Sequence, residues 1–236
     1  MTTISNRLQH ILATIELART NAQRTQQVNL LAVSKAQAVL AIRDAYAAGQ
    51  TKFGENYLQE ALEKQNELAD LAIEWHFIGP IQSNKTQSIA QHFTWVHSLD
   101  RLKIAQRLND ARPANLAPLQ VCIQLNISNE VSKGGITQHE LEALAAVIVK
   151  LPQLKLRGLM AIPAPSNNKD QQRAQFKQVL ECYDALLAKG FELDTLSIGM
   201  SDDYEIAIEQ GATIVRIGSA LFGSRLSNIE SNAIRI

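Results

Sequence analysis

The stretch Leu30-Leu31-Ala32-Val33-Ser34-Lys35 decides the fold class. Five apolar or small residues follow one another without alternation, and a lysine ends the run. A strand that is apolar on both faces is typical of a parallel sheet covered by helices on each side. The lysine is then expected at the carboxyl end of the strand, where open α/β sheets and (β/α)8 barrels place their ligands.

Two interpretations of Lys35 are open from this stretch alone. Partial burial lowers the pKa of a lysine, and a neutral amine can attack a carbonyl to form a Schiff base. The simpler interpretation is a solvated charge that ends a strand, and the stretch by itself favours it. The rest of the chain has to decide between the two.

Seven further strand candidates alternate with helical patterns. They are residues 52–56, 75–79, 93–97, 119–127, 155–162, 195–200 and 213–218. Such alternation predicts a parallel sheet, and eight units within 236 residues favour a (β/α)8 TIM barrel over an open, doubly wound sheet. The open sheet is the alternative, but no GxGxxG follows the first strand, which argues against a dinucleotide-binding sheet.

The organisation of the chain predicts a single domain over residues 1–236. Residues 1–24 carry an extra N-terminal helix, in which Leu8 and Leu12 share an apolar face. Residues 225–236 form a polar tail. No composition shift marks a domain boundary between them.

Composition and charge exclude several classes of partner. A hydrophobic content of 46% supports a large core, and a net charge of +0 offers no field for nucleic acid or an anionic membrane. No apolar run reaches the ~20 residues that span a bilayer, and no signal peptide begins the chain. Cys122 and Cys182 lie too far apart for a zinc-binding pair. We therefore expect a cytoplasmic protein with buried free thiols and no metal.

Two segments near the end of the chain could together bind a phosphate. Ser201 could cap a helix whose free N–H groups face the site, and Gly218-Ser219 opens a turn after the last strand. Barrels frequently bind phosphate with the loops after strands seven and eight and a short extra helix. Singly, these are an ordinary N-cap and a tight turn, whereas together they favour an anion site.

The other polar residues near strand ends have structural interpretations as well. Arg216 points either into the barrel, where it would need an anionic or hydrogen-bonding partner, or out among the helices. His76 and His97 each stand alone, and no third residue makes either one half of a nucleophile–base pair. Asp202-Asp203 is interpreted as charge that favours a helix N-terminus, with no metal ligands beside it.

A reactive lysine and a phosphate site together point to pyridoxal 5′-phosphate (PLP). This cofactor carries an aldehyde and a phosphate on one flat ring. When a barrel closes, strand one becomes the neighbour of strand eight. Lys35 would then lie beside Gly218 and Ser219, as the cofactor requires.

Long motifs give the chain a resemblance to a known family. It resembles the pyridoxal phosphate homeostasis proteins, single-domain relatives of alanine racemase, from the leading helix to Gly223. The motifs are Leu31-Ala32-Val33-Ser34-Lys35, Phe53-Gly54-Glu55-Asn56-Tyr57-Leu58-Gln59-Glu60, Trp75-His76-Phe77-Ile78-Gly79-Pro80-Ile81-Gln82-Ser83-Asn84-Lys85, Arg157-Gly158-Leu159-Met160, Gly199-Met200-Ser201-Asp202-Asp203 and Val215-Arg216-Ile217-Gly218-Ser219.

The resemblance implies the barrel of the alanine racemase N-terminal domain and a cofactor site within it. Lys35 matches the lysine that holds PLP as a Schiff base. The phosphate contacts match Ser201, Gly218 and Ser219.

Three further residues match the lining of the cofactor site. Arg216 is implied near the cofactor, facing either the ring nitrogen or the phosphate. Asn56 and His76 are implied along the cofactor face. One departure is Ala36-Gln37, because relatives often have threonine after the lysine; we expect a local change without loss of binding.

Two functions from different classes are open. A carrier would hold PLP on the lysine and release it to another amine, with apo PLP-dependent enzymes as candidate recipients. A PLP-dependent amino-acid racemase needs an acid/base group on each face of the cofactor. In two-domain alanine racemases a second domain supplies one of these groups, and this chain has no residues left for it. We therefore expect a non-catalytic PLP-binding protein, and a monomer because that domain also provides a dimer interface.

Overall fold

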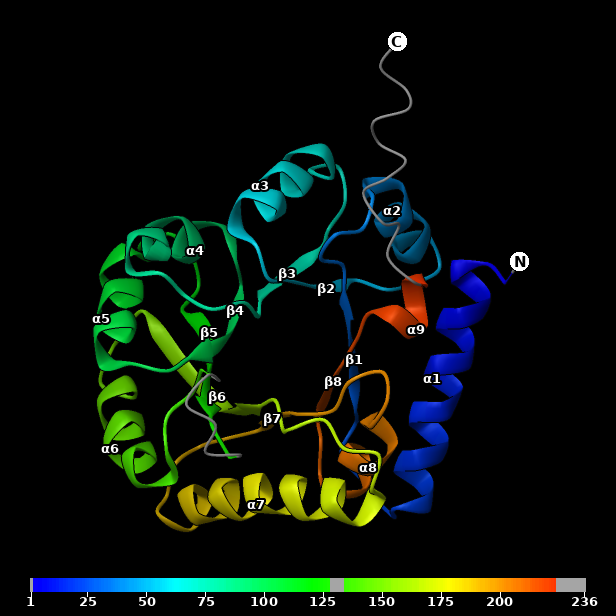
Figure 1. Cartoon of the computed structure of the whole chain (residues 1–236). Coiled ribbons are helices and arrows are strands. Elements are labelled where there is room, and N and C mark those ends of the chain that lie inside the picture. Colours follow the sequence, from blue (N-terminus) through cyan, green and yellow to red (C-terminus); the bar gives the residue numbers. More distant parts are fainter. Residues whose placement is uncertain (1, 128–133, 224–236) are drawn as a thin grey trace.

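The eight expected strands form a closed barrel in chain order, with every neighbouring pair parallel and β8 paired to β1 (Figure 1). This computed structural model describes residues 2–127 and 134–223. The predicted tail 225–236 and most of the loop 128–135 lie outside the described residues. The (β/α)8 prediction is confirmed, and the open-sheet alternative is wrong.

The strands begin and end within two residues of their predicted bounds in nearly every case. They are β1 (Asn29–Val33), β2 (Lys52–Glu55), β3 (Glu74–Phe77), β4 (Trp95–Leu99), β5 (Leu119–Leu125), β6 (Leu154–Ala161), β7 (Thr195–Ser197) and β8 (Ile214–Ile217). One difference matters for the site. Because β1 ends at Val33, Lys35 lies in the turn that follows the strand.

The helices surround the barrel, and the predicted leading helix precedes it. They are α1 (Ile4–Asn21), α2 (Val39–Ala47), α3 (Leu58–Glu67), the 3-10 helix η1 (Ser83–Lys85), α4 (Thr86–His92), α5 (Leu102–Ala111), α6 (Gln138–Ile148), α7 (Lys169–Ala188), α8 (Tyr204–Glu209) and α9 (Ser219–Phe222). Within the described ranges, no helix combines the length and the apolar character needed to cross a membrane.

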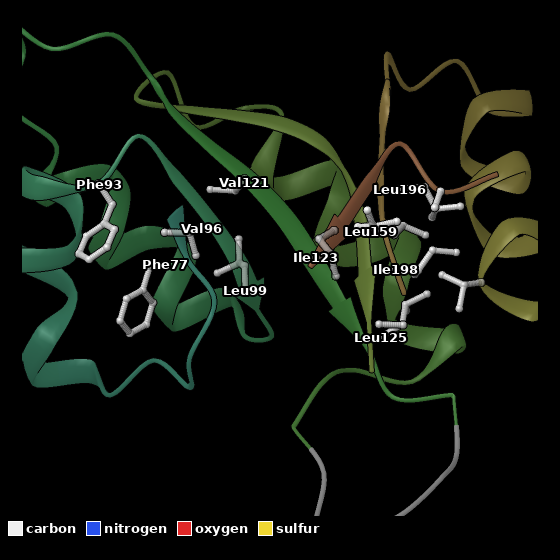
Figure 2. Close-up of a cluster of buried hydrophobic side chains, with 14 of the residues drawn as sticks. Phe77, Phe93, Val96, Leu99, Val121, Ile123, Leu125, Leu159, Leu196 and Ile198 are labelled. Carbon is white, nitrogen blue, oxygen red and sulfur yellow. The ribbon is translucent and has the colours of Figure 1, made fainter. Parts of the chain in front are cut away.

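The main hydrophobic core lies between the strands and the ring of helices, and we call it the outer core. Side chains alternate between the two faces of a strand, so every second strand residue contributes to it. Phe77 and Phe93, for example, meet edge to face with ring centroids 5.3 Å apart. Figure 2 shows the part of the outer core built on β3 to β7, with labelled side chains Phe77, Phe93, Val96, Leu99, Val121, Ile123, Leu125, Leu159, Leu196 and Ile198.

The interior of the barrel has a different composition. Trp95, Cys122 and Met160 form a small apolar cluster that is separate from the outer core. The buried side chains of His76 and His97 also lie inside the barrel wall, each in a ring contact with Trp95. The interior therefore mixes a few apolar side chains with buried polar ones.

Both cysteines are free and buried, as the sequence predicted. Burial raises the pKa of the Cys122 thiol to about 12, and it raises the pKa of Cys182 as well. A thiol with a raised pKa is a poor nucleophile. The two side chains therefore act as small apolar residues of the fold.

Helix α1 contacts two helices that come much later in the sequence. It packs along α8 and α9, as the blue and orange-red ribbons show in Figure 1. The Arg7 guanidinium donates hydrogen bonds to the carbonyl oxygens of Leu221 (2.5 Å) and Phe222 (3.5 Å). Free carbonyls at a helix end need such donors, so α1 holds the last described helix in place.

Candidate functional site

A pocket of about 240 Å³ opens at the carboxyl ends of the strands, and we call it the carboxyl-end pocket. It brings together six of the seven predicted site residues: Lys35, Asn56, Ser201, Arg216, Gly218 and Ser219. They meet because β1 pairs with β8, which places Leu31 opposite Arg216. The volume suits a ligand with a single ring.

The predicted residues share this pocket with side chains that sequence reasoning did not select. Val33, Ile78, Ile162 and Met200 supply apolar walls, and Gln37 adds an amide. These apolar residues could have been selected from the sequence, because each one lies at the end of a predicted strand or shortly after it. Aliphatic walls around a few polar groups are typical of a site for a flat, small molecule.

The turn that presents Lys35 has an unusual backbone conformation. Ala36 has a φ of +57°, in the left-handed region that costs a non-glycine residue about 1–2 kcal/mol. The turn is closed by Gln37, whose N–H donates to the carbonyl oxygen of Ser34 at 3.0 Å. Glu60 accepts a hydrogen bond from the N–H of Ala36 at 2.6 Å. Strain that surrounding groups hold in place is common at functional sites.

A buried lysine completes this support from below the turn. The Lys64 ammonium donates to the carbonyl oxygen of Ser34 at 2.7 Å, to Glu55 at 2.8 Å and to Glu60 at 2.5 Å. The peptide groups on both sides of Lys35 are thus fixed by α3 side chains. The sequence offers one clue, since Glu60 and Lys64 are four residues apart on one helix face.

The buried carboxylate beneath the turn has a shifted pKa. Burial raises the pKa of Glu55, against Lys64 and the Ser34 hydroxyl, which both lower it. The Ser34 hydroxyl donates to Glu55 at 2.7 Å, which adds a second partner. A carboxylate that is taken out of water needs such donors to stay ionised.

The proposed phosphate cradle is assembled differently from the prediction. Ser201 does not cap α8, because that helix begins at Tyr204 and its N-cap residue is Asp203. The Ser201 hydroxyl lies instead at the start of α9. It accepts hydrogen bonds from the Ser219 hydroxyl at 3.2 Å and from the N–H of Ala220 at 3.5 Å.

Arg216 points into the barrel, which decides between the two predicted directions. Its guanidinium donates to the Ser197 carbonyl oxygen (2.5 Å) and hydroxyl (2.8 Å) and to the Ala161 carbonyl oxygen (3.0 Å). Burial lowers the pKa of Arg216 to about 10, although Asp203 and Cys122 raise it. The arginine therefore stays charged at neutral pH.

His76 is the one predicted site residue that does not line the carboxyl-end pocket. It lies inside the barrel, where its Nδ1 is 2.9 Å from His97 Nε2 and its Nε2 is 2.8 Å from a Glu74 carboxylate oxygen. The ring also stacks on Trp95. His76 lies inside β3, and its ring is in contact with Trp95 and His97 in the barrel interior.

Asn56 carries an unused acceptor at the pocket. Its Oδ1 is buried and has no hydrogen-bond partner among the described residues. The end of β3 passes close by, since a Cβ at Gly79 would lie 2.0 Å from the Asn56 carbonyl oxygen. Only glycine permits this approach. A buried polar atom without a partner is a natural contact for a ligand.

These observations fit PLP. Lys35 is partly buried in the pocket wall and supplies an amine. Gly218 lines the pocket beside Ser219, and a Cβ there would come within 3.2 Å of the Val33 carbonyl oxygen, so the residue packs closely against β1. The buried Asn56 Oδ1, which has no hydrogen-bond partner among the described residues, could accept a hydrogen bond from the cofactor. No group of three or more metal-ligating side chains occurs in residues 2–127 and 134–223.

Comparison with known proteins places the barrel in a class. Residues 7–226 match the family model described as alanine racemase, N-terminal domain. The alanine racemase of Corynebacterium glutamicum shares the fold, with a TM-score of 0.64 and 17% identity over 89% of this chain and 59% of that one. The protein is thus a barrel of the alanine racemase N-terminal type.

Closer relatives identify the family. The pyridoxal phosphate homeostasis protein of Pseudomonas aeruginosa is 57% identical over 95% of this chain and 97% of its own length. That of Escherichia coli K12 is 49% identical over 95% and 98%. PipY of Synechococcus elongatus, solved with PLP bound, has a TM-score of 0.83 and 36% identity over 94% of this chain and 100% of that one. The chain belongs to the pyridoxal phosphate homeostasis protein family.

Proposed function

We propose that this protein binds PLP covalently through Lys35 and buffers or delivers it in the cell. When bound, PLP would supply an aldehyde that reacts with primary amines. Lys35 would provide the amine that holds it, and another amine could take the place of Lys35. The observation that carries the proposal is the position of Lys35, on a supported turn beside the Ser201, Gly218 and Ser219 cradle.

The remaining pocket residues would each contact a different part of PLP. Ser201, Gly218 and Ser219 would hold the phosphate. Arg216 would face the ring, because Ser197 and Ala161 hold its guanidinium inside the barrel, deeper than the cradle. Asn56 would accept a hydrogen bond from a polar substituent.

The make-up of the pocket favours a carrier over a racemase. A racemase needs a second acid/base group opposite the lysine. Besides Lys35, the titratable side chains in the described pocket lining are Arg216, which stays protonated at neutral pH, and Asp202, an exposed carboxylate that would be the one candidate for this second group. Tyr57 is 60% exposed and Tyr204 is buried, and neither lines the pocket. The carrier is further expected to work in the cytoplasm and as a monomer.

The test begins with borohydride reduction of PLP-loaded protein and peptide mapping. The modified peptide should contain Lys35, and the Lys35→Ala variant should carry no reducible cofactor. The exposed Lys103→Ala variant is the matched control and should label as the unmodified protein does. Label fixed on another lysine would refute the assignment.

A racemase assay separates the two functions. The PLP-loaded protein is incubated with single enantiomers of amino acids, and chirality is followed over time. We expect no turnover that depends on Lys35. A robust rate that Lys35→Ala abolishes would make the protein an enzyme.

A further inference from the structure

Four consecutive hydrogen bonds cross the inside of the barrel. They join Arg216 to the Ser197 hydroxyl (2.8 Å), Ser197 to His97 Nδ1 (2.8 Å), His97 Nε2 to His76 Nδ1 (2.9 Å) and His76 Nε2 to Glu74 (2.8 Å). We call these five residues the interior chain. His97 on β4 and Ser197 on β7 are three strands apart around the wall, so their hydrogen bond passes through the interior.

The donors and acceptors that each group offers fix the direction in which the hydrogen bonds of the interior chain are donated. The Glu74 carboxylate only accepts, so a neutral His76 carries its proton on Nε2 and accepts through Nδ1. His97 must then donate from Nε2 and accept through Nδ1, and the donor to that nitrogen is the Ser197 hydroxyl. Arg216 only donates, and it donates to the same hydroxyl oxygen. Every link therefore points from Arg216 toward Glu74.

The charge states required by this direction agree with the surroundings. Burial lowers the pKa of His76, and it lowers the pKa of His97 well below the usual range, so both imidazoles are neutral. The hydrogen bond from His76 lowers the pKa of Glu74, which keeps that carboxylate ionised. Lys52 and Arg157 also lower the pKa of Glu74, and Asp203 interacts electrostatically with Arg216.

The two ends of the interior chain open at opposite mouths of the barrel. Arg216 lines the carboxyl-end pocket. Glu74, whose side chain is 38% exposed, lines a second cavity of about 530 Å³ together with Lys52 and Arg157. The residues between them are sealed from solvent, since His97 and Ser197 are fully buried.

We infer that His97, His76 and Glu74 are positioning residues that hold Arg216 in place for the cofactor, with Glu74 as a remote counter-charge at the other mouth of the barrel. This inference rests on the proposed function for its effect on PLP. Within residues 2–127 and 134–223, the Arg216 guanidinium donates to two carbonyl oxygens and one hydroxyl and to no carboxylate. The orientation of that hydroxyl is set by the histidines behind it.

The first experiment measures the imidazole protons in the cofactor-free protein. Protein labelled with 15N-histidine is examined by NMR, in which protonated and unprotonated ring nitrogens resonate far apart. The His76 and His97 signals are assigned by their loss in His76→Gln and His97→Gln. Both rings should be neutral with the proton on Nε2. A proton on Nδ1 of either ring would overturn the inference.

The second experiment measures PLP affinity and the absorption spectrum of bound PLP in variants of the interior chain. His97→Phe fills the space but breaks two links, and we expect about tenfold weaker binding and a shifted absorption maximum. His97→Gln retains one acceptor and one donor, so it should restore both. Glu74→Gln, which removes the charge, should weaken binding about threefold, while the distant Glu142→Gln should not.

The possible outcomes separate this inference from the proposed function. Unchanged affinity and spectrum in both His97→Phe and Glu74→Gln would refute the positioning role. If His97→Phe fails to fold, Glu74→Gln and the NMR result still decide. If Lys35→Ala keeps its reducible cofactor, the proposed function fails, but the imidazole protons still test the interior chain without any cofactor.

Discussion

The outer core and the barrel interior are both buried, yet they are built on opposite principles. The outer core is a continuous apolar layer in which aliphatic and aromatic side chains fill the space between strands and helices (Figure 2). Among the described residues, the interior includes the small apolar cluster of Trp95, Cys122 and Met160 and the five residues of the interior chain. The outer core depends on side chains that fill its volume, whereas the interior depends on pairing each hydrogen-bond donor with an acceptor.

This difference separates stability from function. Apolar packing is non-directional, so many side chains of suitable size could maintain the outer core. A buried hydrogen bond is directional, and losing one partner leaves the other unsatisfied. The directional region is the one that reaches the carboxyl-end pocket, through Arg216. Substitutions in the two regions should therefore have different consequences.

The largest expected effect is on the stability of the outer core. Phe93 is 1% exposed, and Phe93→Ala should lower the free energy of unfolding by about 4 kcal/mol because it leaves a cavity. Urea unfolding measures this change. Leu40 is 74% exposed, so Leu40→Ala is the control and should change stability by less than about 0.5 kcal/mol. A similar cost for both variants would contradict the prediction.

The next effect concerns the buried ion pair between Lys64 of α3 and Glu55 of β2. Lys64→Met leaves the buried carboxylate of Glu55 without its cation and should cost about 3 kcal/mol in urea unfolding. The double variant Lys64→Met, Glu55→Leu removes both charges, so it should recover a large part of that loss. Both variants lack the hydrogen bond from Lys64 to the Ser34 carbonyl oxygen, so the turn that carries Lys35 should be held less firmly in both. Slower or weaker PLP binding would show this change. A double variant no more stable than the single one would contradict this prediction.

A smaller effect should appear in the pH dependence of stability. The pKa of His97 is lowered in the folded protein, so on acidification the unfolded chain takes up a proton first, from about pH 6.5 downward. Proton uptake stabilises the unfolded chain, so stability should fall below pH 6.5 by up to about 1.4 kcal/mol per pH unit for each such histidine.

Urea unfolding at several pH values between 5 and 7.5 checks this slope. The His97→Gln variant should show a shallower fall than the unmodified protein. Glu55 titrates in both proteins, and its raised pKa has the opposite sign, so the difference between the two curves reports His97 together with its contact to His76. Equal slopes would mean that His97 is not buried in its neutral form.

The smallest effect is expected at the amino-terminal mouth of the interior. The Arg157 guanidinium lies 4.7 Å from the centroid of a Trp95 ring and pairs with the partly exposed Asp194. Arg157→Lys keeps the charge but loses the planar stacking, and it should cost about 0.5–1 kcal/mol. Unfolding followed by tryptophan fluorescence measures it. A cost above about 3 kcal/mol would place Arg157 in the core of the interior.

Local patterns predicted the fold because each one lies within a single strand or helix. The apolar run from Leu30 to Val33 predicted a central strand, and eight alternating units predicted closure of the barrel. Closure then placed Lys35 beside Ser219. Strand ends were less accurate, since a run such as Leu30 to Lys35 continues past the last ladder hydrogen bond into the turn.

The interior contacts could not be predicted from local patterns. His97 and Ser197 are 100 residues apart, and Lys64 reaches Ser34 across 30 residues. The resemblance matched His76 to a residue along the cofactor face, and in the structure its side chain is not part of the described lining of the carboxyl-end pocket. One available signal was the alternation of Glu74 with His76 on β3, because two polar residues on the same face of a buried strand require partners inside the barrel.

The contact between Arg7 and the carbonyl oxygen of Leu221 has a consequence for how the chain matures during synthesis. Helix α1 and the lysine turn leave the ribosome well before β8 and α9 do. Pairing β1 with β8 requires closing the chain between them into one long loop, which is a slow step in folding. A growing chain therefore carries its reactive lysine long before it has the cradle and arginine beside it. Tight retention of a ligand in the carboxyl-end pocket would thus begin only after β8 and α9 have emerged and paired, and it would report that the barrel has closed.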